Sequence, residues 1–409
     1  MALSFRAKRR QILATLKSFE STEYSKRFGL RAAAVESYED FALLPLMDPE
    51  LLGRYFELLA IRKEECVAVQ SSGTTGRRKT VYVPKDERCA PLPPAIDEAL
   101  KLSARAVTAH SERDRLERFY WVHERSFEEW YPRASLVAYS DVESILRAAK
   151  GEVLVLYDYP SSVEHFLYTL ERVSGAADRR EIAKRALYIE LTGEPVTRER
   201  VAQIAEAAER VFGVEPLIEV TYGASETGLI GVCEDPRRGT EYAVADRVFV
   251  EVVGESGKPL PPGHAGEVVV TPLATKGTIL VRYRLGDLGS LELKGGRLVL
   301  ELLGRIPGED VVYVCGGKLH VQRLAQLLRE ELGIPVKLRV MKLKRGLSVK
   351  LFLPPSSDVD KESAKRRCLS LICELADLSS FDLAIEPVNI VVEKRFHGGK
   401  EWSLAQLTL

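Results

Sequence analysis

Between about residues 118 and 222, short apolar strands alternate with helical segments, and this alternation constrains the fold more than any other feature of the chain. The pattern predicts strands at Leu136–Tyr139, Val153–Leu156, Ala186–Ile189 and Leu217–Val220, with helices near 141–149, 161–174 and 197–211. Strands linked through helices need crossover connections, so the sheet that they form is mostly parallel. Sheets of this kind bind ligands beyond the carboxyl ends of their strands.

Three of the predicted strands exit into polar turns, at Tyr157–Ser162, Thr192–Pro195 and Thr221–Thr227. The rule for ligand position makes these exits candidate binding segments. Each exit taken alone fits a simple turn with a helix N-cap equally well.

A further candidate is Ser71–Lys79, which follows the strand-like run Cys66–Gln70 and contains two glycines, four hydroxyl side chains and three cations. Glycines let consecutive backbone N–H groups converge on an anion, and hydroxyls and cations add donors and charge, so the segment suits phosphate. It is not a Walker A loop, because Arg78 and Lys79 stand where that motif has Gly-Lys. Composition alone fits a solvated turn as well.

The flanking regions have different patterns. The first 60 residues predict helices, with an amphipathic one at Arg6–Phe19, and a further helix is predicted at about 95–110. Residues 240–305 change to a β pattern typical of hairpins or a small barrel. The last hundred residues predict a separate α+β module with helices at 320–332 and 360–375 and strands at 336–341, 348–352 and, last, 388–392.

Size and charge narrow the classes of function. A chain of 409 residues exceeds one comfortable core, so we expect two or more domains. Lys+Arg and Asp+Glu both number 59, so bulk charge favours neither nucleic acid nor membranes as partners. No run has the apolar length of a membrane span or a signal peptide, which predicts a cytoplasmic protein that acts on small molecules; a homodimer stays open.

Two residue types give weaker indications. Asn389 is the only asparagine and 29% of residues are charged, a composition typical of thermophiles. The six cysteines have no spacing typical of a zinc site, and we expect free, mostly buried thiols.

The order of residues in Ser71-Ser72-Gly73-Thr74-Thr75-Gly76, followed by Lys79, resembles the signature loop of the AMP-forming acyl-activating superfamily. Later segments resemble that family's motifs in the family's order, and the first two resemble its phenylacetate-CoA ligase branch: Tyr159-Pro160-Ser161, Gly193-Glu194-Pro195, Tyr222-Gly223-Ala224-Ser225-Glu226, Tyr283-Arg284-Leu285-Gly286-Asp287, Gly304-Arg305 before the hinge Gly308-Glu309-Asp310, and Gly399-Lys400. Four features depart from the pattern. Leu285 replaces a threonine, Gly308 is an additional residue, Glu309 takes the first acidic hinge position, and an arginine usual after the terminal lysine is absent.

The resemblance implies an α/β fold. A large N-terminal domain, residues 1–305, would have mostly parallel sheets and a small β-barrel-like part, and a small mobile C-terminal α+β domain would span 306–409. It also implies ATP-dependent activation of a carboxylic acid as an acyl-adenylate, with release of pyrophosphate, and transfer of the acyl group to CoA. The cofactors implied are ATP/AMP, Mg²⁺ and CoA.

The resemblance also implies roles for single residues. Ser71, Ser72, Gly73, Thr74, Thr75, Gly76 and Lys79 would hold phosphates, with Thr74 and Lys79 taking part in catalysis. Glu226 would hold Mg²⁺, and Tyr222 would stack on adenine beside Gly193-Glu194-Pro195, with Thr221, Gly223 and Ser225 in the same segment. Asp287 would accept the ribose hydroxyls and Arg305 would lie near the ribose or phosphate. Lys400 would stabilise the adenylation step and then withdraw as the small domain rotates about Glu309-Asp310, to be replaced by the ribbon ending at Gly316-Gly317.

Alternative functions remain open at this point. The acyl-adenylate could pass to an amine, a hydroxyl or a protein cysteine, for which Cys315 on the ribbon is the residue to watch, although a buried inert thiol fits it better. A non-catalytic AMP-binding sensor fits the departures from the motifs. The acid is not readable, because the aromatic residues between 120 and 160 suit an aromatic substrate and an ordinary core equally.

Overall fold

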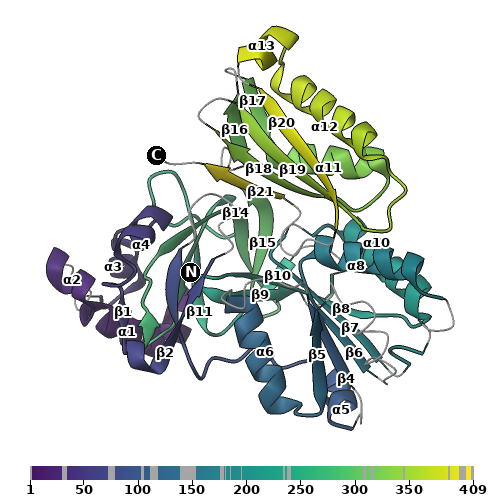
Figure 1. Cartoon of the computed structure of the whole chain (residues 1–409). Coiled ribbons are helices and arrows are strands. Elements are labelled where there is room, and N and C mark those ends of the chain that lie inside the picture. Colours follow the sequence, from purple (N-terminus) through teal and green to yellow (C-terminus); the bar gives the residue numbers. More distant parts are fainter. Residues whose placement is uncertain are drawn as a thin grey trace.

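The computed structural model describes most of the chain: residues 2–29, 35–71, 79–102, 106–110, 118–138, 153–175, 179, 181–184, 186–194, 196–233, 235–236, 241–306, 310–314, 317–343, 346–385, 387–395 and 402–406. The fold is α/β, as the sequence predicts, with a large part built on one mixed sheet and a smaller α+β module (Figure 1).

Eleven strands of the described chain form the large sheet, in the order β11-β12-β14-β15-β10-β9-β8-β7-β6-β4-β5. Five of them pair in parallel, and these are β4 (Ala106–His110), β5 (Ala134–Ala138), β6 (Val153–Asp158), β7 (Ala186–Thr192) and β8 (Leu217–Ala224). Two crossover helices pack together on this half, α8 (Pro160–Val173) and α10 (Arg198–Phe212). Pro160 pre-sets the first turn of α8 and the Thr197 side chain caps α10 by accepting from the amide of Arg200, so both helices begin directly after strand exits.

The predicted helix at 95–110 is wrong in its second half. The structure has a helix, α5, only over Pro94–Leu102, and residues 106–110 form β4 between β5 and β6. The sequence Ala-Val-Thr-Ala-His has no strong local preference, and pairing with strands on both sides decides its conformation. Helix α6 (Arg118–Trp130) follows.

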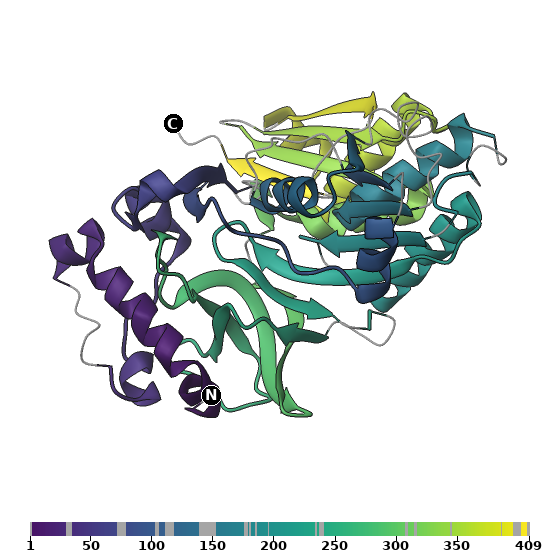
Figure 2. The ribbon, with the colours of Figure 1, turned by 90° about the horizontal axis from the view of Figure 1, so that it is seen from below.

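The other half of the sheet is antiparallel and continuous with the parallel half through the β8–β9 pair. Its strands are β9 (Gly228–Cys233), β10 (Glu241–Val244), β11 (Val248–Val253), β12 (Gly266–Pro272), β14 (Tyr283–Lys294) and β15 (Arg297–Arg305). The N-terminal helices pack at this end of the molecule, as Figure 2 shows from below. They are α1 (Ala2–Glu20), α2 (Glu23–Phe28), α3 (Tyr38–Ala42) and α4 (Pro49–Tyr55).

Two small sheets lie beside this half. One pairs β1 (Ala60–Ile61) with β13 (Gly277–Thr278). After a short 3-10 turn (Lys63–Glu65), the other pairs β2 (Cys66–Gln70) with β3 (Thr80–Pro84), so the signature-loop segment connects two antiparallel strands.

The C-terminal module has its own core, centred on helices α11 (Val321–Leu332) and α12 (Lys361–Ala376) and strands β18 (Lys337–Lys342) and β19 (Leu347–Leu353). A ribbon of β16 (Val311–Val314) and β17 (Gly317–His320) precedes it, and α13 (Ser380–Ile385) and β20 (Val388–Lys394) follow. The expectation that the strand near 388–392 is the last one is wrong. A further strand, β21 (Trp402–Gln406), pairs in parallel with β18, because the edge of β18 is available for it.

Candidate functional site

The hairpin of β8 and β9 carries most of the predicted adenine- and metal-binding segment. Strand β8 continues past the predicted end at Val220 to Ala224, and a tight turn leads into β9. The register of the β8–β9 pair shifts between Tyr222 and Gly223. At Gly223 a Cβ would come within 2.7 Å of the carbonyl oxygen of Gly228, so glycine is required for the two strands to approach this closely.

Tyr222, Asp287 and Arg305 form a set joined by one hydrogen bond and one ion pair. The Tyr222 hydroxyl donates to Asp287 Oδ2 (2.7 Å), and Arg305 Nε lies 3.2 Å from Asp287 Oδ1. Asp287 and Arg305 are register partners on β14 and β15, and Arg305 also donates to the carbonyl of Leu285 (3.0 Å). Burial and the adjacent Asp287 carboxylate raise the pKa of Tyr222 well above its ordinary value, so the phenol keeps its proton as a donor.

Lys79 and Glu226 form a second pair, 147 residues apart in sequence. Lys79 Nζ donates to Glu226 Oε1 at 2.9 Å, and the Tyr283 hydroxyl lies 3.5 Å from the same oxygen. At the base of the signature loop, Ser71 donates its amide to the Lys79 carbonyl, and the Ser71 hydroxyl accepts from the Lys79 amide. The loop is therefore closed at its neck by Ser71 and Lys79.

Both sets lie on the same elements. The β8–β9 hairpin carries Tyr222 and Glu226, and β14 carries Tyr283 and Asp287. These contacts thus join Lys79 of the loop segment to the Tyr-Gly-x-Ser-Glu segment, and that segment to the Gly-Asp motif and the end of β15.

Other predicted residues have interior partners. The Thr221 hydroxyl is buried and donates to Glu190 (3.1 Å), and its carbonyl accepts from Thr192. The Glu194 carboxylate, 2% exposed, accepts from the amide (3.0 Å) and the hydroxyl (2.6 Å) of Ser161 and pairs with Arg200 (3.4 Å). Glu194 therefore ties the exit of β7 to the first turn of α8, and its place beside adenine stays a prediction.

Several predicted site residues lie outside the described residues. They are Ser72, Gly73, Thr74, Thr75, Gly76, Pro195, Glu309, Cys315, Gly316 and Lys400, together with the whole predicted helix near 141–149. The second hinge carboxylate, Asp310, is described and lies 3.4 Å from the ring of His320.

Sequence reasoning missed a layer of supporting residues beneath the site. His123 Nε2 lies 3.0 Å from Glu190, the same carboxylate that accepts from Thr221, and the His123 ring stacks on Tyr157. The motif that contains Tyr283 predicts no role for this residue, whose hydroxyl lies 3.5 Å from the Glu226 carboxylate. A local pattern signals none of these contacts, since each joins segments more than 30 residues apart.

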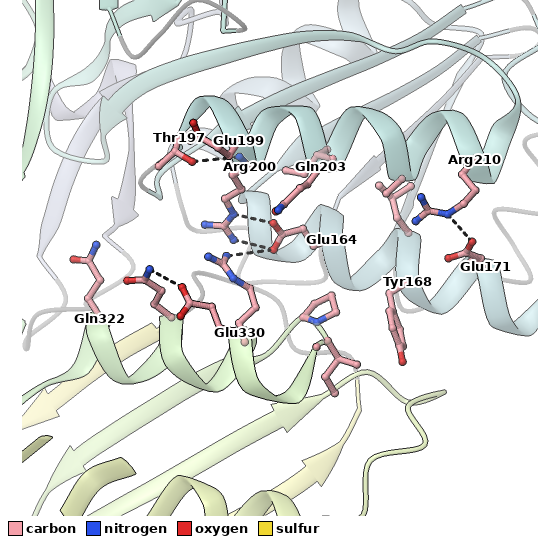
Figure 3. Close-up of a pocket in the computed structure, with 18 residues that line it drawn as sticks. Glu164, Tyr168, Glu171, Thr197, Glu199, Arg200, Gln203, Arg210, Gln322 and Glu330 are labelled. Carbon is pink, nitrogen blue, oxygen red and sulfur yellow. Dashed lines mark hydrogen bonds and ion pairs between the residues drawn. The ribbon is translucent and has the colours of Figure 1, made fainter. Parts of the chain in front are cut away.

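A cavity of about 700 Å³ lies elsewhere, between α8 and α10 on one side and α11 on the other (Figure 3). It is lined by the bidentate Arg200–Glu164 pair, with Arg329 of α11 at 4.0 Å from Glu164. None of the predicted site residues lines it. Beside it, Lys337 of the terminal module, fully buried, donates to the hydroxyl of Ser162 at 2.7 Å.

The described cysteines are free thiols, as predicted. Cys66, Cys89, Cys233 and Cys368 are buried and Cys373 is partly exposed. Within the described residues, no helix is both long and apolar enough to cross a membrane.

No protein-family model matches the chain. The indoleacetate–lysine synthetase of Pseudomonas savastanoi is 29% identical over 231 residues, which are 55% of this chain and 51% of that protein. The chain therefore spans about half the length of this curated relative.

Solved structures of 2-hydroxyisobutyryl-CoA ligase share the fold over almost the whole chain. The postadenylation state in complex with 2-HIB-AMP has a TM-score of 0.57 at 15% identity and covers 94% of this chain and 85% of the ligase. The thioesterification state, in complex with 2-HIB-AMP and CoA, has a TM-score of 0.55 at 16% identity and covers 98% and 90%. The chain therefore has the fold of these ligase structures, which agrees with the fold that the resemblance of its motifs implies.

Proposed function

We propose that the protein activates a carboxylic acid with ATP, forming an acyl-adenylate and releasing pyrophosphate. The observation that carries this proposal is that the Tyr222–Asp287–Arg305 set and the Glu226 carboxylate paired with Lys79 are carried by the same β8–β9 hairpin and by β14. A carboxylate with acceptor capacity suits a ribose, and a lysine at the neck of a glycine- and hydroxyl-rich loop suits phosphates.

In this reaction an oxygen of the acid attacks the α-phosphorus of ATP, and the bond to pyrophosphate breaks. Asp287 would accept the ribose hydroxyls. Each carboxylate oxygen has two lone pairs, so the hydrogen bond from Tyr222 and the ion pair with Arg305 leave acceptor capacity on both. The Ser71–Lys79 loop would position the phosphates, and most of the rate would come from positioning and charge stabilisation.

Mg²⁺ fits the residues present. Nucleotide-bound Mg²⁺ usually takes one or two carboxylates, and phosphate and water oxygens complete its coordination. Glu226 supplies one carboxylate, 10% exposed, beside the loop neck. Among the described residues no group of three or more His, Cys, Asp or Glu side chains forms a metal site by itself. Mg²⁺ bound there would neutralise phosphate charge.

For the second half-reaction we propose CoA as acceptor, its thiol attacking the acyl carbon and AMP leaving, in a ligase of the phenylacetate-CoA ligase type. The fold shared with a CoA ligase supports this acceptor. A second candidate is an amine acceptor, which gives an amide; the similarity to a protein named indoleacetate–lysine synthetase supports it. Both routes use the same adenylate and differ only in the nucleophile.

The division at residue 305 and the role of Lys400 are part of the proposal. Residues 306–409 would move relative to the rest, so that Lys400 reaches the phosphates in the first half-reaction and leaves in the second.

The test is acid-dependent ATP–pyrophosphate exchange with a panel of aromatic and aliphatic acids, followed by hydroxylamine trapping with CoA or lysine added. We expect exchange with at least one acid, and loss of the hydroxamate when the true acceptor competes. AMP binding without exchange for any acid would replace this proposal with the sensor function.

A further inference from the structure

Arg118, the first residue of α6, touches the turn that carries Glu226. Its Nη1 donates to the carbonyl oxygens of Ser225 (3.2 Å) and Glu226 (3.1 Å). Its Nε and Nη2 donate to the two carboxylate oxygens of Glu87, at 3.0 and 2.8 Å. The side chains of Arg118 and Glu87 are only 15% and 12% exposed, so solvent screens these charge-assisted bonds weakly.

The turn is shaped to accept this guanidinium. Gly228 has a φ of +77°, and a Cβ at Gly228 would lie 2.9 Å from Arg118 Nη2 and 3.0 Å from its Cζ. A side chain at this position would therefore displace the guanidinium as well as strain the backbone.

The β2–β3 hairpin and the turn that carries Glu226 are joined twice, once directly and once through Arg118. Lys79, directly before β3, holds the Glu226 side chain, and Glu87, just after β3, holds Arg118, which in turn holds the Glu226 backbone. The segment after β3 is also fastened to α6, since Cys89 donates its amide to the Ser126 hydroxyl at 3.0 Å. Helix α6 therefore fixes the position of the β2–β3 hairpin relative to the turn that carries Glu226.

We propose that Arg118, held by Glu87, is a positioning residue that fixes where the Glu226 carboxylate lies. This inference rests on the proposed function, in which Glu226 holds Mg²⁺, and adds a residue that none of the motifs contains. Arginine is suited to the task because two of its nitrogens donate to both oxygens of Glu87 while the third donates to two carbonyls, and the single nitrogen of a lysine cannot reproduce this bidentate geometry.

The kinetic test uses Arg118→Ala, with Arg125→Ala as a control on an exposed arginine of the same helix. In ATP–pyrophosphate exchange, we expect Arg118→Ala to raise the Mg²⁺ concentration needed for half-maximal rate about tenfold and to lower kcat by up to about 10²-fold. Arg118→Lys should restore little, and added guanidinium should restore part of the Arg118→Ala rate. Arg125→Ala should match the wild type.

A double-mutant cycle separates positioning from general structural damage. In the Glu226→Gln variant, adding Arg118→Ala should leave the Mg²⁺ dependence of the rate almost unchanged, because Arg118 acts through Glu226. Full additivity of the two substitutions would overturn the proposal.

We call the contacts by which Arg118 holds the Glu226 turn the clamp. Amide hydrogen exchange tests the clamp and does not depend on catalytic activity. In the nucleotide-free protein we expect faster exchange around Ala224–Gly228 in Arg118→Ala and unchanged exchange in Arg125→Ala. If the wild type activates no acid, the proposed function fails while this measurement still decides on the clamp. Unchanged exchange in Arg118→Ala would overturn the clamp even where activity falls.

Discussion

Asp287 and Glu226 carry the same functional group, but their neighbours give them different chemistry. Asp287 accepts from a phenol and forms an ion pair with a guanidinium, whereas Glu226 pairs with a lysine at the loop neck. We expect Asp287→Ala to weaken ATP binding about 10- to 100-fold, because hydrogen bonds to a charged group contribute about 1.5–3 kcal/mol each. The Glu226→Gln defect should instead shrink as Mg²⁺ is raised.

Calorimetric ATP titrations at several Mg²⁺ concentrations measure both effects. Glu292→Ala, an exposed carboxylate on the same strand as Asp287, is the matched control. Rescue of Asp287→Ala by excess metal would show that the two roles are reversed.

The thiols make a second prediction at this scale. Burial raises the pKa of Cys89 and of Cys368 to about 12, so only about one thiol in 10⁴ is a thiolate at pH 8. In the native protein, Ellman's reagent should react with partly exposed Cys373 well before these two, which should react on unfolding. A Cys315→Ser background removes the thiol outside the described residues. A fast native-state phase that survives Cys373→Ser in that background would contradict the assignment.

At the scale of elements, β14 is placed by a buried arginine just before it. Arg282 has a φ of +50° and donates to Glu251 (3.0 Å), to the carbonyls of Ala42 and Leu44, and to that of Gly257. It thereby ties α3 and the β11–β12 hairpin to the strand that carries Asp287.

We expect Arg282→Met to lower the free energy of unfolding by about 3–5 kcal/mol, because it leaves the buried Glu251 charge uncompensated. Arg284→Ala, which breaks a pair between this exposed arginine and Glu267 at the surface, should lower it by at most about 1 kcal/mol. Urea unfolding measures both. Similar values for the two variants would refute the role given to Arg282.

The pH dependence of the Arg282→Met deficit has a definite sign. Burial raises the pKa of Glu251, and the bonds from Arg282 and Tyr38 oppose that shift. Without Arg282 the folded-state pKa rises further. A carboxyl whose pKa is higher in the folded than in the unfolded state contributes fully to the free energy of unfolding when the pH is below its unfolded-state pKa. That contribution is lost as the pH rises through its folded-state pKa. The deficit should therefore be smaller near pH 4 than at pH 7.

At the scale of the molecule, the terminal module is held against α8 by Lys337. If residues 306–409 move between half-reactions, the bond to Ser162 exists in only one of the two arrangements. Lys337→Met should then change one half-reaction about 10-fold or more relative to the other, as expected for loss of a charged hydrogen bond. Lys350→Met, on the exposed side of β19, is the control. Equal effects on both half-reactions would show that this contact does not distinguish the arrangements.

Lys400 belongs to the same scale, since its role depends on that movement. We expect Lys400→Ala to slow acyl-adenylate formation about 10²- to 10³-fold, the usual loss for one charge-stabilising donor. Transfer from chemically made acyl-adenylate to CoA should survive. Equal loss of both steps would give Lys400 a structural role instead.

Most elements of the described fold were predictable from local pattern. The periodicity of 153–222 predicts β6, β7 and β8 and the helices between them, and capping residues mark where helices begin, as Asp360 does for α12. Prediction failed at Ala106–His110 and Trp402–Gln406, where five-residue strands are specified by the neighbours with which they pair. A short segment has too few residues to show a period.

The candidate site, like the fold, has one part that local sequence predicts and another that it does not. The sequence by itself determined which residue types stand at the strand exits and in the loop, because turns, glycines and acceptor carboxylates follow local rules that a motif records. Only the tertiary structure decided which of them meet: Lys79 with Glu226, Tyr222 with Asp287, and Arg118 with the turn that no motif connects to it. These contacts join segments 65 to 147 residues apart, and their geometry depends on sheet register and packing, which no short stretch of sequence contains.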